Sequence, residues 1–457
     1  MDSDNTAAAS ISSIFVANND NNQTTGTVDA RFFTQSSSFS LELPPTTISR
    51  RRKAWNFLKK KRLFRRNRNN DSGSAISGAT TILDFNYDYD IIDLPVETNT
   101  PTSTKTTGIM LIHPIGVGIA RWYYQRLVSS LVARHAKIGE RLVVVVPDLL
   151  GSGSASNATA GTQKFPLFNI SDWTDQLEAL MSTVETDGGG GGKIDNWCVI
   201  ANGGCSPIAL QLAQRKKLVA RTDVSEAPVS NLVLSSVPRL PFFLKNETTN
   251  DPAKVAKSYR TLSGVPGNLF WWYSCRNDGA FIQTFSEKNL IADPKNLGPK
   301  WRSNCCETAL SFDGKGKYAT FSFLAGTLQD GCLPSLDTIK DTPLKIDIIK
   351  GVDVRRNRAK SWFWQNPKKK DEKNTRNTDH EKPEVEQISA ATAATPASDT
   401  DRSNADDPAN KNYETFRDYA EKNGNGGREL VIGGRISLAH EDPEGYADAI
   451  LLFLFGP

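Results

Sequence analysis

The sequence predicts an α/β protein built on a mostly parallel sheet with helices on both faces. Short apolar runs of strand length recur along the chain, and most of them end at a loop that contains Gly or Pro. Segments with the 3.6-residue apolar spacing of a helix lie between these runs, joined by short links. Strands that alternate with helices in this way pair in parallel, and a parallel sheet needs helices on both faces.

The first elements lie before residue 154. Alternation over Ile82–Val96 favours one or two edge strands. A buried strand is predicted at Ile109–Ile112, and helical spacing over Trp122–Val132 precedes a central strand at Leu142–Val146. That strand ends at the turn Pro147–Gly153, whose sequence is Pro-Asp-Leu-Leu-Gly-Ser-Gly.

The middle of the chain continues the alternation. Ser171 is expected to cap a helix that runs to Met181. The apolar run Trp197–Ile200 predicts a strand, small residues follow it, and a helical pattern begins at Ile208. Leu232–Leu234 predicts the next strand.

Residues 239–330 interrupt this alternation. They contain many aromatic residues and several helical stretches. We therefore expect a helical cap, inserted after the sixth strand and lying over the carboxyl edge of the sheet. The sheet resumes at Leu344–Ile349 and finishes with a strand at Leu430–Ile432 and a helix over Gly445–Phe455.

The predicted core comprises residues 79–238 and 331–457, and two polar regions are predicted to be disordered. Residues 1–78 are rich in Ser, Thr and Asn, apart from a basic arm at 50–68. Residues 365–411, an insertion within the core, have almost no large apolar side chains. Such segments bury too little apolar surface to offset the entropy of ordering.

Composition bounds the class of protein. The 6 cysteines have no metal-ligand spacing, so free thiols are expected, with neither a metal nor another cofactor. No apolar run reaches the ~20 residues that a spanning helix needs. The N-terminus matches no presequence cleanly, and we expect an intracellular protein, cytoplasmic or plastid.

The segment Val199–Leu210 has the context of a nucleophile elbow, a sharp strand-to-helix turn that lifts a nucleophile above a parallel sheet. In the register of the motif Gly-x-Ser-x-Gly, Ala201 and Cys205 take the flanking small positions. Gly203 stands where the serine belongs. Glycine has no side chain, so this position cannot attack a substrate.

Four landmarks follow one another along residues 80–457. They are the loop His113–Gly116, the turn Pro147–Gly153, the elbow Ala201–Cys205 and the acidic-proline start of the last helix at His440–Glu444. In this order they resemble the α/β-hydrolase superfamily. Three narrower motifs are similar to a group of hydrolase-like proteins from photosynthetic organisms: His113–Gly118, Gly267–Phe270 and Phe321–Gly326.

The resemblance implies a triad of nucleophile, base and acid. The acid would follow the strand Leu344–Ile349, where Asp353 stands. The base of the family would fall at Arg435 or Ile436, and neither is a histidine. Because the nucleophile position is Gly203, two of the three positions are substituted, and we expect a degenerate triad.

Other nucleophiles and bases remain as alternatives. Cys205 or Ser206 could attack, with His440 as the base, and the protein would then be an active esterase or thioesterase. Pro207 or Ile208 would, however, occupy the position two residues on, which needs a small side chain. We expect instead that Cys205 and Ser206 pack or start the helix, and that His440 lies at the surface or caps the last helix.

Groups that bind without reacting remain at the same place. The loop after Ile112 and the amide of Gly204 lie where strands end and a helix begins, which suits a carboxylate, phosphate or carbonyl oxygen. A small, partly apolar or carbonyl-containing ligand under the aromatic cap is therefore expected. His113 is expected mainly to order its loop, and the cap aromatics could instead simply pack on the sheet. The predicted ligand site consists of His113, Pro114, Ile115, Gly116 and Gly204.

The basic arm Arg50–Arg68 holds 11 Lys or Arg and no acid, so the rest of the chain carries +4 − 11 = −7. Trp55, Phe57, Leu58 and Phe64 could form an apolar stripe within it. The arm fits an anionic membrane surface, on which the protein would act as a scaffold, or less well a nucleic acid. A solvated linker is the third interpretation.

Overall fold

The structure is a computed structural model, and the residues it describes all belong to one compact unit, Met1–Asp353 with Thr415–Pro457. The second unit, Val354–Glu414, lies outside the described residues. The described residues are 30–43, 81–96, 105–135, 138, 140–158, 167–186, 193–220, 227–237, 251–276, 279–329, 344–352, 418, 420–421, 424 and 426–456.

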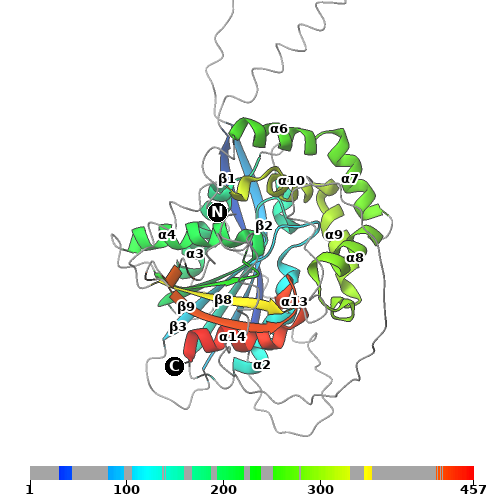
Figure 1. The fold of residues 1–457 in the computed structure, drawn as a ribbon. Coiled ribbons are helices and arrows are strands. Elements are labelled where there is room, and N and C mark those ends of the chain that lie inside the picture. The colour runs from blue at the N-terminus through cyan, green and yellow to red at the C-terminus, as the bar shows by residue number, and fades with distance from the viewer. Residues whose placement is uncertain are drawn as a thin grey trace, which may run out of the picture. The chain divides into compact units, whose positions relative to one another are not determined.

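One twisted sheet runs through this unit (Figure 1). Its strands are β1 (Arg31–Leu43), β2 (Thr81–Leu94), β3 (Thr106–Ile112), β4 (Arg141–Pro147), β5 (Asn157–Ala158), β6 (Asn196–Asn202), β7 (Val229–Ser235), β8 (Lys345–Val352) and β9 (Gly426–Gly433). They are arranged as β1-β2-β4-β3-β6-β7-β8-β9, with β5 beside β2. Pairs that involve β2 are antiparallel, and the pairs from β4 to β9 are parallel. The predicted fold class is confirmed.

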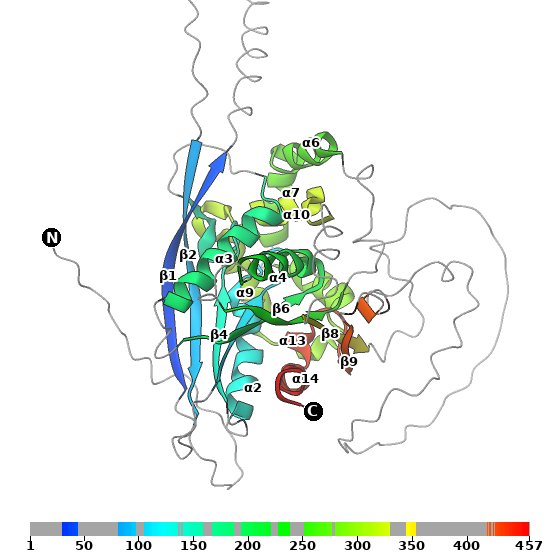
Figure 2. The ribbon, with the colours of Figure 1, turned by 90° about the vertical axis from the view of Figure 1, so that its left-hand side faces the viewer.

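The central strands are buried on both faces because helices cover each side. Every residue of β3 and β6 is buried. The helices α3 (Ile170–Thr186) and α4 (Ser206–Ala220) cover one face, and α2 (Gln125–His135) and α14 (Pro443–Phe455) cover the other (Figures 1 and 2). Continuous apolar runs, rather than alternating ones, are the sequence signature of such strands.

A helical segment, residues 251–329, lies between β7 and β8. It consists of α6 (Pro252–Leu262), α7 (Val265–Arg276), α8 (Ala280–Phe285), α9 (Lys300–Gly314) and α10 (Lys317–Ala325), with short turns between them. These helices occupy the residues for which a helical cap was predicted. The loop after β3 approaches α9 so closely that a Cβ on Gly118 would lie 1.8 Å from the carbonyl oxygen of Cys305. The segment therefore rests on the carboxyl end of β3.

The prediction of disorder over residues 1–78 is wrong for Arg31–Leu43. These 13 residues form β1, paired along its whole length with β2. The serines and threonines that suggested disorder donate hydrogen bonds across the pair: Thr34 to Asp90 (2.9 Å), Ser36 to Asp88 (2.7 Å) and Ser40 to Asp84 (2.5 Å). The basic arm 50–68 and the insertion 365–411 lie outside the described residues.

The structure also tests the predicted cap of α3 and the predicted free thiols. The cap of α3 is Asn169 and not Ser171, because Asn169 Oδ1 accepts from the backbone N–H of Ser171 at 3.0 Å, one residue into the helix. Among the cysteines that the structure describes, all are free thiols: Cys198, Cys205, Cys275, Cys305 and Cys306.

Replacing Gly118 with Ala should destabilise the fold by about 3 kcal/mol, because the new methyl group meets a backbone carbonyl and the residue has a φ of +69°. Urea unfolding followed by circular dichroism measures this loss. Gly433→Ala is the matched control, since a Cβ there would lie 3.7 Å from Asp442, an ordinary contact. Equal midpoints for the two variants would contradict the close approach.

Candidate functional site

The turn after β6 keeps the backbone of a nucleophile elbow. The strand ends at Asn202, a short 3-10 turn spans Gly203–Cys205, and α4 begins at Ser206. Gly203 has a φ of +55°, in the left-handed region that glycine adopts readily. The nearest atom to a Cβ built on Gly203 would be the carbonyl oxygen of Ser236, 3.9 Å away. The turn therefore has space for a Cβ, and Gly203 presents no side chain there.

The two alternative nucleophiles are buried beside this turn. Cys205 is 1% exposed and packs in the apolar core. Burial raises the pKa of its thiol to about 12, against a smaller opposing effect of a backbone hydrogen bond from Ile115. Ser206 is fully buried, and its Oγ donates to the carbonyl oxygen of Gly203 at 2.7 Å. A neutral buried thiol is a poor nucleophile, and so is a buried hydroxyl whose proton is already donated to a carbonyl oxygen.

The loop after β9 lies beside the elbow, at the place where the resemblance puts the base. The carbonyl oxygen of Ile436 accepts hydrogen bonds from Asn202 Nδ2 at 3.1 Å and from Ser236 Oγ at 2.9 Å. The side chain of Ile436 is apolar and 37% exposed, so it takes no proton. Arg435 turns toward the helical segment and donates to the carbonyl oxygen of Lys288. Asp353, the candidate acid, lies outside the described residues.

His440 is buried, and not at the surface as expected, because the helical segment covers it. It belongs to the short helix α13 (Leu438–Glu441). Its Nε2–H donates to the carbonyl oxygen of Leu297 at 2.7 Å, and its ring meets the edge of Trp301 at 4.6 Å between centroids. Burial lowers the pKa of His440 to about 4. The ring is thus a neutral group that joins α13 to the helical segment.

His113 orders its loop, as the sequence predicts. Its Nδ1–H donates to the carbonyl oxygen of Pro114 at 3.0 Å, and its Nε2 accepts from the backbone N–H of Leu149 at 3.2 Å. The ring is fully buried, and burial lowers its pKa, which keeps it neutral. Both ring nitrogens are engaged within the protein, so His113 positions the loops after β3 and β4.

The remaining residues of the predicted ligand site come together under α10. Thr320 Oγ1 donates to the carbonyl oxygen of Gly116 at 2.9 Å. The ring of Phe323 lies on Gly204, where a Cβ would come within 2.9 Å of it. Pro114 has no N–H to offer, and the amide of Ile115 faces the Cys205 thiol. One helix therefore bridges the loop after β3 and the elbow.

Two residues at this edge were missed by the sequence analysis. Among the described residues other than glycine, Ser236 is the one with a positive φ, +50°, and it follows β7 directly beside the elbow. Asn202 is buried and also contacts Tyr123 Oη at 3.3 Å. The sequence carried one usable signal, since a polar residue directly after a buried parallel strand lies at the carboxyl edge where ligands bind.

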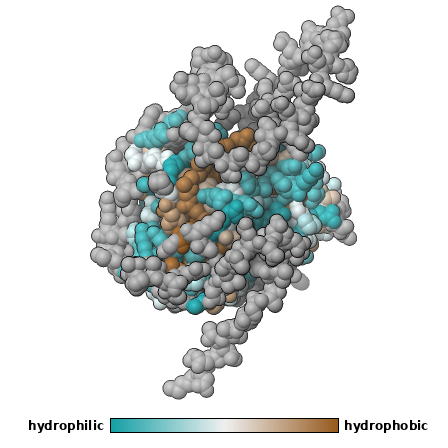
Figure 3. Space-filling view, turned by 90° about the horizontal axis from the view of Figure 1, so that it is seen from below, coloured by the Kyte–Doolittle hydropathy of each residue, from teal (hydrophilic) through white to brown (hydrophobic). Residues whose placement is uncertain are grey.

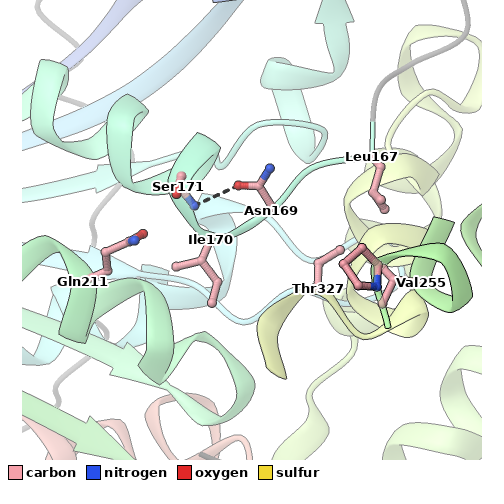
Figure 4. A pocket seen from close by; sticks show the side chains of 8 residues that line it. Leu167, Asn169, Ile170, Ser171, Gln211, Val255 and Thr327 are labelled. Atoms are coloured by element: carbon pink, nitrogen blue, oxygen red, sulfur yellow. Dashed lines mark hydrogen bonds between the residues drawn. The ribbon is translucent and has the colours of Figure 1, made fainter. Parts of the chain in front are cut away.

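A pocket of about 340 Å³ lies between helices α3 and α4 on one side and the helical segment 251–329 on the other (Figure 4). Ile170 and Gln211 lie on one side of it and Val255 and Thr327 on the other. Gln211 lies eight residues after Gly203, and most of these residues belong to α4. At the rise of a helix, this separation is roughly 12 Å between Gln211 and Gly203. The pocket is therefore separate from the elbow. Its lining residues are Leu167, Asn169, Ile170, Ser171, Gln211, Pro252, Val255 and Thr327.

Native protein should leave Cys205 and Ser206 unmodified by iodoacetamide and by a fluorophosphonate, because both side chains are buried and the thiol is neutral. Mass spectrometry of tryptic peptides maps the modified residues. Protein unfolded in urea is the control, in which the iodoacetamide should alkylate Cys205. Modification of either residue in the native state, lost in Cys205→Ala or Ser206→Ala, would restore the active-hydrolase alternative.

His440 should make the free energy of unfolding fall as the pH drops. The pKa of His440 is about 4 in the fold, against an ordinary value of 6.5 for histidine. Below 6.5 the unfolded chain therefore binds a proton that the folded chain refuses, at a loss that reaches about 3 kcal/mol near pH 4. His440→Gln keeps a donor for Leu297 but does not titrate. Urea unfolding at pH 7 and pH 4.5 should show a smaller loss in this variant, and equal losses would contradict the shift.

Comparisons with known proteins give structural similarity without sequence similarity. No family model matches the sequence, and no curated protein matches it either. Similar solved structures include a peroxisomal α/β-hydrolase from Saccharomyces cerevisiae, with 14% identity over 92% of this chain and 87% of that one and a TM-score of 0.48. A candidate α/β-hydrolase from Nostoc sp PCC 7120 has 12% identity over 81% and 95% of the two chains, with a TM-score of 0.46.

A thioesterase domain from the curacin biosynthetic pathway has 10% identity over 80% of this chain and 95% of that one, with a TM-score of 0.43. At such values these proteins say nothing about activity here. The chain's own topology identifies the fold. The parallel strands β4, β3, β6, β7, β8 and β9, the antiparallel β1 and β2 at one edge, the sharp turn into α4 and the helices on both faces are features of the α/β-hydrolase fold. This chain therefore has an α/β-hydrolase scaffold.

Proposed function

We propose that this protein binds a small, partly apolar ligand and does not catalyse hydrolysis. The observation that carries the proposal is the elbow, whose backbone is retained while Gly203 presents no side chain. Ile436 beside it supports the same conclusion, because an aliphatic side chain cannot act as a base. An active esterase or thioesterase that uses Cys205 or Ser206 has the burial of both side chains against it.

The pocket at the start of α3 is the favoured place for the ligand. Its volume of about 340 Å³ lies at the lower end of the range for small-molecule sites. Leu167, Ile170, Pro252 and Val255 supply apolar walls, and no residue that lines it is charged. An uncharged ligand with an apolar body therefore fits better than an ion.

The polar groups of the pocket add a requirement for hydrogen bonding. Asn169, Ser171, Gln211 and Thr327 lie around the apolar walls. Asn169 Oδ1 is already used by the first turn of α3, and Gln211 Oε1 accepts from Thr174 at 2.9 Å. The amide nitrogens of both side chains can still donate, which favours a ligand that carries a carbonyl or ether oxygen.

The neutral fluorescent probe N-phenyl-1-naphthylamine should bind wild-type protein and brighten, and Leu167→Trp should weaken its binding by about tenfold because an indole fills the pocket. Val265→Trp is the matched control, since that side chain is 72% exposed on α7. A fluorescence titration gives both dissociation constants.

A second variant, Val255→Trp, fills the pocket from α6 and guards against a local effect at Leu167. Circular dichroism establishes that each variant is folded. Binding of the probe that is equal in wild type and in both pocket variants would contradict this site. Hydrolysis of p-nitrophenyl butyrate by wild type, abolished in Cys205→Ala or Ser206→Ala, would contradict the non-catalytic function.

A further inference from the structure

Helix α7 exposes an apolar face to solvent. Five of its side chains, between 40% and 72% exposed, lie on this side: Val265, Leu269, Phe270, Trp272 and Tyr273. The opposite side is anchored, since Trp271 and Cys275 are buried and Trp271 Nε1–H donates to the carbonyl oxygen of Ala309 at 3.1 Å. A surface helix of a soluble domain ordinarily shows polar residues here, so a contiguous apolar face marks an interaction surface.

The apolar face continues onto α8. The rings of Phe270 and Phe281 meet edge to face at 5.6 Å between centroids, and Phe281 stacks on Phe285 at 6.1 Å. Phe281 is itself 36% exposed. The surface therefore spans two helices.

The helix that precedes this apolar face exposes basic residues. Helix α6 precedes α7 directly and exposes Lys254, Lys257 and Arg260. Residues 251–329 contain ten Lys or Arg and six Asp or Glu, a net charge of +4. The chain carries +4 in all and the arm +11, so the remainder carries +4 − 11 − 4 = −11. The segment that exposes the aromatic residues is thus net positive.

We propose that α6 and α7 together bind the surface of an anionic membrane. Leu, Phe, Trp and Tyr side chains of α7 would enter the interface between headgroups and acyl chains, where amphipathic aromatic rings are most stable. Lys254, Lys257 and Arg260 would pair with anionic headgroups. In the described part of the chain no helix is long and apolar enough to cross a membrane.

Helix α6 connects this surface to the pocket. Val255 and Pro252 of α6 line the pocket, while Lys254 and Lys257 on the same helix are exposed. A partly apolar ligand dissolved in the membrane would therefore reach the protein next to its binding site. The membrane surface stands on the exposure and charge of α6 and α7 alone, and it survives if the pocket binds nothing.

Sedimentation of the full-length protein with vesicles tests the proposal. Vesicles of phosphatidylcholine with phosphatidylserine should bind the protein, and pure phosphatidylcholine much less. Lys254→Gln with Lys257→Gln should weaken binding about thirtyfold, since two basic groups are lost from the surface. Leu269→Ser with Tyr273→Ser should weaken it about tenfold by removing apolar area.

Two controls separate this surface from others. The side of the molecule on which α14 lies in Figure 1 also carries a hydrophobic band (Figure 3), and Leu452 of α14 is 40% exposed. Leu452→Ser should leave vesicle binding unchanged. All variants are repeated in a chain in which the 11 Lys and Arg of the arm are replaced by Gln, so that binding through the arm does not hide the effect.

Three outcomes would overturn the proposal. The first is equal vesicle binding by wild type and both double variants. The second is an equal loss in Leu452→Ser. The third is binding to an RNA oligonucleotide that depends on Lys254 and Lys257, with no effect of Leu269→Ser and Tyr273→Ser on vesicles. Probe binding in the pocket, measured separately with N-phenyl-1-naphthylamine, reports on the proposed function and does not bear on these outcomes.

Discussion

The carbonyl oxygen of Ile436 accepts hydrogen bonds from Asn202 and Ser236, and these two bonds tie the loop after β9 to the ends of β6 and β7. Both donors are side chains, whereas the acceptor belongs to the backbone. The backbone at position 436 is therefore held beside the ends of β6 and β7, one residue from Gly203 in the case of Asn202. These two bonds therefore bring the loop after β9, the elbow and the residue after β7 together at one edge of the sheet.

Burial controls the chemistry of the groups that remain. The pKa of Cys205 is raised and the pKa values of His113 and His440 are lowered, in each case chiefly by desolvation. Each group is thereby kept neutral near pH 7. A hydrolase needs the opposite arrangement, a base poised near the working pH and a nucleophile within its reach. The bonding of these residues is better suited to holding loops together than to catalysis.

The central sheet and the elbow could be predicted because their signals are local. Uninterrupted apolar runs predict β3, β4 and β6. Gly203 is found from its fixed position in the five-residue elbow motif. β1 was missed because its serines and threonines bond to aspartates of β2, which is distant in the sequence. The burial of His440 and the pocket around Val255 likewise arise where separate helices meet. Pairing across the fold leaves no periodic trace in the sequence.

The glycine at position 203 also affects the stability of the elbow. An L-residue with a side chain is strained in the left-handed region, by about 1 to 2 kcal/mol, and an active hydrolase tolerates this strain to expose its nucleophile. Gly203 adopts its φ of +55° without that strain. Glycine at this position thus leaves the turn between β6 and α4 free of that strain. Selection for stability would therefore favour glycine at this position over a residue with a side chain.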